Sequence, residues 1–130
     1  MSRTEALSDA LIEMIKVRCT NVYYEEGVQV GMEKKKYPFV TLELEDIGNT
    51  DGATKYVLEL NVIDYGKIKS TAEELADKIQ DDLDHINYID ENIQFRSYKD
   101  GRKTIKEDDK QVIRKRLMFE IIMYDLKGEE

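Results

Sequence analysis

The sequence predicts a single α+β domain over residues 1–130, with a mostly antiparallel sheet of four to five strands and two helices packed on one face. Three observations predict this fold. Two segments carry apolar residues at helical spacing, several others alternate apolar and polar residues as strands do, and turn residues separate the segments. The expected order of elements is α-β-β-β-α-β-β, without an internal repeat or a linker.

The chain begins with an amphipathic segment that we expect to be a helix over residues 3–17. Ser2 and Glu5 have the spacing of a capping box, in which their side chains satisfy free N–H groups of the first turn. A short strand is expected over residues 20–25. Residues 26–36 combine glycines with three consecutive lysines, so we expect an exposed loop that is mobile in the free subunit.

The middle of the chain is expected to be a hairpin followed by a helix. Residues 39–47 and 54–65 both alternate apolar and polar positions, and a Gly-Asn-Thr-Asp-Gly turn joins them. After Gly66 a helix is expected over residues 70–87, opened by a second capping box formed by Ser70 and Glu73. Its apolar stripe must fold back onto the sheet to be buried.

The C-terminal part of the chain is expected to add two more strands. Residues 92–99 form the first of them, and residues 99–110 form a charged loop that begins with Asp-Gly. The last strand covers residues 112–126 and is apolar at nearly every position between 117 and 124. Side chains from the sheet and the second helix should form one core that contains Leu60, Leu75, Ile79 and Phe119.

The last strand places apolar side chains on both faces of the sheet. Met118, Ile122 and Tyr124 point away from the face that the helices cover. With Val57, Ile63 and Tyr65 they would make a patch larger than a monomer usually exposes. Two alternatives are open: the long loops fold over this patch, or a second subunit covers part of it. We favour the second subunit.

Composition excludes several functional classes. The chain carries 20 basic and 28 acidic residues, a net charge of −8, which argues against sequence-specific binding of nucleic acid because phosphate contacts need a basic surface. No apolar run approaches the roughly 20 residues of a membrane span. The single cysteine and single histidine leave little material for a disulfide or a zinc site.

No catalytic, metal-binding or cofactor-binding site is predicted, and we expect a protein that is not an enzyme. Asp77, Asp81 and Asp84 lie on adjacent turns of the second helix, but without histidines at ligand spacing they are better explained as a solvated helix face. Cys19 and His85 could form a nucleophile and its base only if the fold brought them together, and nothing in the sequence indicates this.

The order of these signals resembles small tail proteins of long-tailed bacteriophages and prophage-like elements, in the tail-terminator or tail-completion group. The resemblance extends over nearly the whole chain, and it consists of the order of the elements and of short stretches of sequence. Its parts are NVYYEE at 21–26, YPFVTLELED at 37–46, IDYG at 63–66, ELADKIQDDLD at 74–84, QFRSYKDGR at 94–102 and RKRLMFEIIMY at 114–124.

The resemblance implies a structural role in the virion tail, in a protein assembled in the bacterial host cytoplasm. Such proteins form a homo-oligomeric ring, commonly a hexamer, that caps the tail tube and joins it to the head-tail connector. Another neck or tail connector component is one alternative, and a small bacterial regulatory or ligand-binding domain is another. Residues expected to contact neighbouring subunits or partners are Lys34, Lys35, Lys36, Arg102, Lys103, Met118, Ile122 and Tyr124.

Overall fold

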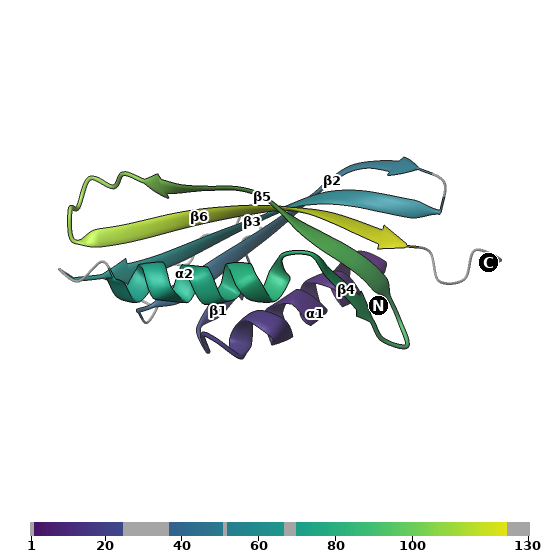
Figure 1. Ribbon diagram of the computed structural model, residues 1–130, viewed down its shortest axis with the longest axis horizontal. Coiled ribbons are helices and arrows are strands. Elements are labelled where there is room, and N and C mark those ends of the chain that lie inside the picture. Colours follow the sequence, from purple (N-terminus) through teal and green to yellow (C-terminus); the bar gives the residue numbers. More distant parts are fainter. Residues whose placement is uncertain (1, 25–36, 51, 67–69, 125–130) are drawn as a thin grey trace.

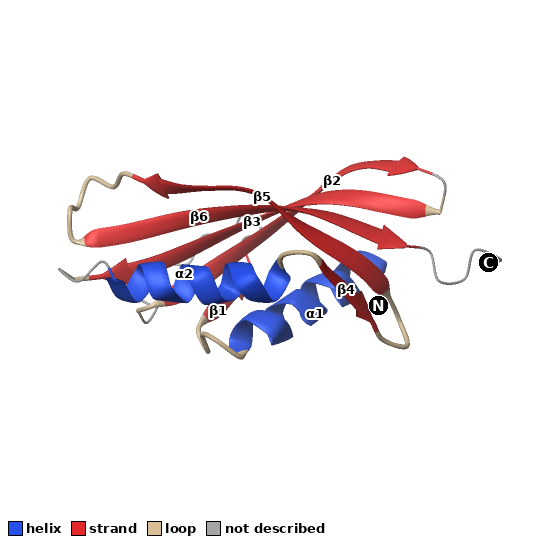
Figure 2. Ribbon diagram, in the orientation of Figure 1, coloured by secondary structure: helices blue, strands red, loops and turns tan. Residues whose placement is uncertain are grey.

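The computed structural model describes residues 2–24, 37–50, 52–66 and 70–124. These residues form an α+β fold in which two helices lie on one side of a six-stranded, strongly twisted sheet (Figure 1, Figure 2). The elements in chain order are α1 (Arg3–Lys16), β1 (Val22–Tyr24), β2 (Phe39–Thr50), β3 (Ala53–Tyr65), α2 (Ser70–Leu83), β4 (Ile86–Ile89), β5 (Gln94–Ile105) and β6 (Val112–Tyr124).

The sheet has the strand order β1-β2-β3-β6-β5-β4. The short strand β1 runs parallel to β2, and all other neighbouring strands are antiparallel. Helix α2 packs against the three strands β3, β5 and β6, while α1 lies nearer to β1. The α+β class and the helices on one face are therefore confirmed, but the sheet is mixed and larger than predicted.

The additional strand is β4, which lies where the sequence predicts the end of the second helix. Helix α2 ends at Leu83 rather than at residue 87, and His85 adopts a left-handed conformation with φ of 56°. Such a backbone conformation cannot continue a helix. Ile86–Ile89 then alternates between half-buried and exposed side chains along the edge of β5.

The predicted loop over residues 99–110 is wrong for its first half, because β5 continues to Ile105. Lys99 and Gly101 face Phe119 and Met118 of β6, so Asp100 is an extra residue in the strand. Such a β-bulge lets the strand continue past the Asp-Gly pair that the sequence predicted to be a turn. The other predicted loop, residues 26–36, lies outside the described residues.

The core lies between the helices and the sheet. Leu60, Ile79 and Phe119 are fully buried in one cluster, as predicted, whereas Leu75 is only partly buried at its margin. The other large, fully buried members of this cluster come from both helices and from three strands: Leu7, Leu11, Ile15, Leu42, Leu58, Leu83 and Phe95.

The two predicted capping boxes have different outcomes. At α1, the Glu5 N–H donates to Ser2 Oγ and the Ser2 N–H donates to Glu5 Oε1, which confirms the first box. At α2, Ser70 is already the first helical residue, so the position that would cap the helix is outside the described residues. The carboxylate of Glu73, the other predicted member, binds Arg102 and Lys115 instead.

Candidate interaction surfaces

The sheet face opposite the helices, here called the open face, carries alternating apolar and charged side chains. Met118, Ile122 and Tyr124 of β6 all lie on it, as predicted, and all are half-buried. Met118 lies between Glu59 on β3 and Gly101 on β5, and Ile122 lies between a lysine and an arginine of the same two strands. Along β6, Met118 and Ile122 are separated by Glu120, which lies between Val57 of β3 and Tyr98 of β5.

Charged side chains on the open face are paired across strands. Arg116 Nε lies 3.4 Å from Glu59 Oε2 and donates to Asn61 Oδ1 at 3.3 Å. Asn61 in turn donates to Glu59 Oε2 at 3.1 Å. At the end of the same face, Arg114 Nε lies 3.1 Å from Glu107 Oε2. These pairs join β3 to β6, and β6 to the segment after β5, on a surface that no described helix covers.

An aromatic cluster occupies one corner of the open face. The sequence analysis placed Ile63 and Tyr65 on this face but did not identify the aromatic residues beside them. Phe39 is buried, with its ring centroid 5.4 Å from that of Tyr37 and 5.8 Å from that of Tyr23. Tyr37 also contacts Tyr65 at 5.6 Å, and both tyrosines are exposed. The available signal was that Phe39 and Ile63 alternate onto the same face and are cross-strand partners.

Arg102 and Lys103, predicted together as contact residues, lie on opposite faces of the sheet. The bulge at Asp100 shifts the alternation of β5 by one residue, so Arg102 faces α2. Lys103 is exposed on the open face, opposite Arg116. The structure thus brings Lys103 onto the same face as the three predicted β6 residues and separates Arg102 from them.

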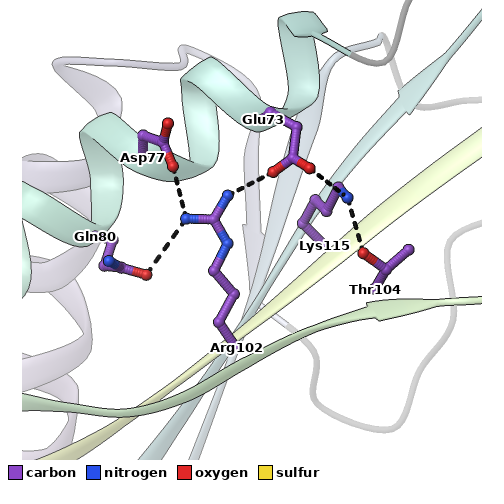
Figure 3. A network of polar contacts seen from close by, with 6 residues as sticks. All are labelled: Glu73, Asp77, Gln80, Arg102, Thr104 and Lys115. Carbon is purple, nitrogen blue, oxygen red and sulfur yellow. Dashed lines mark hydrogen bonds and ion pairs between the residues drawn. The ribbon is translucent and has the colours of Figure 1, made fainter.

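Arg102 is the centre of a polar network between α2 and the sheet (Figure 3). Its guanidinium donates to Asp77 Oδ1 at 2.7 Å, to Glu73 Oε1 at 2.6 Å and to Gln80 Oε1 at 3.4 Å. The other oxygen of Glu73 lies 2.8 Å from the ammonium of the buried Lys115. A buried ammonium needs such a partner, since an unpaired buried charge is costly.

The network also changes the acidity of Glu73. The hydrogen bond from Lys115 lowers the pKa of the Glu73 carboxyl most, and the bond from Arg102 lowers it further against the opposing effect of partial burial. Lys115 is also held by Thr104, whose hydroxyl lies 2.8 Å from its ammonium. These contacts are internal to the subunit, and they fix the helix on the sheet.

The other acidic residues of α2 do not converge on one point. Arg18 holds Asp82 through two hydrogen bonds, and Asp84 accepts the backbone N–H of Lys99, which lowers the pKa of that aspartate. Within the described ranges, no group of three or more His, Cys, Asp or Glu side chains is arranged to hold a metal ion. Asp82 thus joins the end of α2 to the segment after α1, and Asp84, directly after α2, is joined to β5.

Cys19 and His85 have separate partners. The buried thiol of Cys19 donates to the carbonyl oxygens of Asn21 and Pro38, and burial raises its pKa, which disfavours the reactive thiolate. His85 is exposed and binds Asp84 through Nδ1 at 2.8 Å. Each of the two side chains is thus bound to other residues, and neither is described in contact with the other.

A hollow of about 330 Å³ opens between the end of α1 and the first turns of α2. Its walls mix apolar and charged side chains, and none of them is a buried titratable group. The lining residues are Val17, Arg18, Pro38, Thr71, Glu74, Leu75 and Lys78. In the part of the chain that the structure describes, neither helix is long and apolar enough to cross a membrane.

The geometry defines a small α+β protein with one helix-covered and one open sheet face. No family model and no curated protein matches the sequence. In fold, the chain is similar to a chain of a solved structure described as the virion of a native gene transfer agent particle. The TM-score is 0.65 at 13% identity, over 88% of this chain and 91% of the other.

A second solved structure, whose name states no function, is similar to the same extent. It aligns with a TM-score of 0.66 at 12% identity, over 95% of this chain and 96% of its own. At such identities the likeness establishes a shared fold over nearly the full length of both chains.

Proposed function

We propose that this chain is a non-enzymatic structural protein of a phage or phage-like virion, and that its copies form a ring that ends the tail tube and joins it to the head connector. The observation that carries the proposal is the likeness to a chain of the gene transfer agent virion over 88% of this sequence. The resemblance of the sequence to tail-terminator proteins points in the same direction.

The open face supports an assembly role. Interfaces between subunits commonly combine apolar side chains with a polar rim. The open face offers the half-buried Met118, Ile122 and Tyr124 with charged side chains beside the first two. Lys103 is exposed beside them. In this proposal these residues contact a neighbouring copy or the tail tube, and Lys34, Lys35 and Lys36 contribute a further basic contact.

The mass of the purified protein tests the proposal directly. Light scattering after size-exclusion chromatography and negative-stain microscopy should show closed rings of several copies, which attach to the ends of isolated tail tubes. A protein that remains monomeric or dimeric and leaves tube ends bare contradicts the proposal. Attachment to the head side alone would favour the alternative of a different neck component.

The three lysines provide a variant for the same experiment. Changing Lys34, Lys35 and Lys36 to Glu should block ring formation or attachment to tubes while leaving the thermal unfolding midpoint unchanged. The matched control reverses the charge of three exposed lysines elsewhere in the chain, Lys16, Lys78 and Lys110. If both variants assemble like the parent protein, the lysine segment has no part in the contact.

A further inference from the structure

The long strands β2 and β5 each have a shorter neighbour on their outer side, which pairs with only part of their length. Strand β1 pairs with β2 at residues 40–42, and β4 pairs with β5 at residues 94–97. Residues 43–50 of β2 pair only with β3, and residues 98–105 of β5 pair only with β6, among the strands that the structure describes. The outer sides of these two segments are here called the β2 free edge and the β5 free edge. A free edge presents unpaired backbone donors and acceptors to a further strand.

We propose that copies of this chain join edge to edge, with the β2 free edge of one copy pairing antiparallel with the β5 free edge of the next. The inference rests on the self-assembly part of the proposed function, and it specifies the strands through which copies meet. A strand added to a sheet edge gains affinity from main-chain hydrogen bonds and specificity from its side chains.

The charges of the two free edges are opposite. Residues 43–50 contain Glu43, Glu45 and Asp46 and no basic residue, so their net charge is −3. Residues 98–105 contain three basic residues and one aspartate, a net charge of +2. Arg102 is paired with Glu73 and Asp77 inside the subunit, so Lys99 and Lys103 provide the exposed positive charge of this edge. Each edge therefore repels its own kind and attracts the other, which disfavours symmetric pairing and favours β2 against β5.

The direction of the backbone groups fits the same pairing. The N–H of Val40 points outwards to Asn21, so by the alternation of an antiparallel strand Leu44 also directs its N–H and C=O outwards. On β5 the N–H of Lys99 points outwards and donates to Asp84. Because Asp100 is an extra residue in the strand, the next residues whose backbone groups point outwards are Arg102 and Thr104. All the outward-pointing residues place their side chains on the helix-covered face. Pairing therefore keeps the two faces of neighbouring sheets aligned.

The two free edges have the same length, and full overlap selects one register. Residue 43 then lies opposite residue 105, and residue 50 lies opposite residue 98. In this register Leu44 and Thr104, which both point outwards, face each other and exchange two hydrogen bonds. Glu45 lies opposite Lys103 as a non-hydrogen-bonded pair, in which Cα atoms are about 4.5 Å apart. Both of these side chains are exposed on the open face.

The contact uses a different strand on each partner, so every copy can bind two neighbours. Contacts of this kind produce a ring when the rotation closes. Because β2 and β5 run in opposite directions and each is covered at its beginning, the two free edges lie at opposite ends of the sheet. A tilt of the strands relative to the ring axis accommodates this offset between the two free edges, as strand tilt does in closed barrels.

Disulfide trapping between two variants tests the register. An equimolar mixture of Glu45→Cys and Lys103→Cys, oxidised under assembly conditions, should give a covalent dimer, since the expected Cα separation suits a disulfide. Neither variant alone should give that dimer, because each cysteine would face the unchanged residue of its neighbour. The two positions lie on strands separated by β3 and β6, roughly 14 Å apart, so a bridge within one copy is excluded.

Two controls sharpen the result. A mixture of Glu43→Cys and Lys103→Cys displaces one partner by two residues and should give at least five-fold less dimer. The unmodified protein reports any cross-link through the buried Cys19. Rings that form without a Glu45–Lys103 cross-link overturn the edge pairing and leave the proposed ring intact. A protein that never associates, alone or with tail tubes, overturns both.

Charge exchange gives an independent test. Glu45→Lys alone and Lys103→Glu alone should each raise the concentration for half-assembly by about ten-fold, because each places like charges opposite each other. The double variant restores opposite charges and should assemble within about three-fold of the parent protein. Glu13→Lys on the exposed side of α1 is the matched control. Single variants that assemble like this control contradict the pairing.

Discussion

The two faces of the sheet are built from the same strands and differ in the contacts that stabilise them. Along β6 the odd-numbered side chains from Ile113 to Met123 are all buried, while the even-numbered ones between them are half-buried. The helix-covered face is held by apolar contacts in a closed core. The open face is held by cross-strand charge pairs and, at one corner, by the aromatic cluster around Phe39. This difference means that neighbouring residues of one strand should respond very differently to the same substitution.

The largest expected difference is between Phe119 and Met118. Phe119→Ala removes a fully buried ring and should lower the free energy of unfolding by about 3–5 kcal/mol through lost burial and a residual cavity. Met118→Ala on the open face should cost about 1 kcal/mol or less, since its side chain is only half-buried. Urea denaturation of both variants measures the difference. Equal losses would mean that the open face is as closely packed as the core.

The alternation of apolar residues was sufficient to predict which faces of β3 and β6 are buried. The sequence analysis placed Leu60 and Phe119 in the core and Met118 and Ile122 on the opposite face, and the structure confirms both placements. Side-chain alternation is a local property of an extended strand. The contact role proposed for the open-face residues remains a prediction.

The strand count could not be predicted in the same way. Strand β4 is short and follows α2 after one turn, and Ile86 continues the helical spacing of the apolar residues before it. Only the backbone conformation of His85 shows that the helix has ended. At Asp100, an Asp-Gly pair is equally compatible with a turn and with a bulge, and pairing with β6 decides between them.

That bulge is also the reason why the sites could be predicted only in part. With regular alternation Arg102 would share a face with Tyr98, but the inserted residue turns it towards α2. The acidic β2 free edge was not identified, because Glu43 and Glu45 read as the solvated face of a strand. Both residues lie on a free edge because β1 pairs only with residues 40–42 of β2, and this pairing is known only from the fold.

The second comparison sets Arg102 against its neighbour Lys103. Arg102→Met removes the hydrogen bonds to Glu73, Asp77 and Gln80 and should destabilise the protein by about 1–2 kcal/mol. Lys103→Met, on the open face, should change the stability of the monomer by less than about 0.5 kcal/mol. Denaturation below the concentration for assembly measures both. A larger effect for Lys103 would show that the open face carries the stronger polar contacts.

The smallest expected effect is a pH dependence that belongs to the helix-covered face. The pKa of Glu73 in the folded protein is lowered, chiefly by the hydrogen bond from Lys115, while in the unfolded chain it is about 4.3. A carboxyl whose folded pKa is lowered stabilises the folded state above its unfolded pKa, and this contribution disappears as the pH falls through the folded pKa. Because about half of the Glu73 side chain is exposed to solvent, we expect about 0.5 kcal/mol or less.

Glu73→Gln should therefore be less stable than the parent protein at pH 7, and the two stabilities should converge as the pH falls below about 4. Glu74→Gln is the matched control, because Glu74 is exposed on the same helix turn and binds no described residue. Urea titrations at several pH values measure the difference for each variant. A gap between Glu73→Gln and the parent that persists unchanged at low pH would mean that the Glu73 side chain acts through its packing and not through its charge. The ion pairs of Glu73 with Arg102 and Lys115 would then add nothing measurable to the attachment of α2, and only the pair of Arg102 with Asp77 would remain as a charged contact of this network.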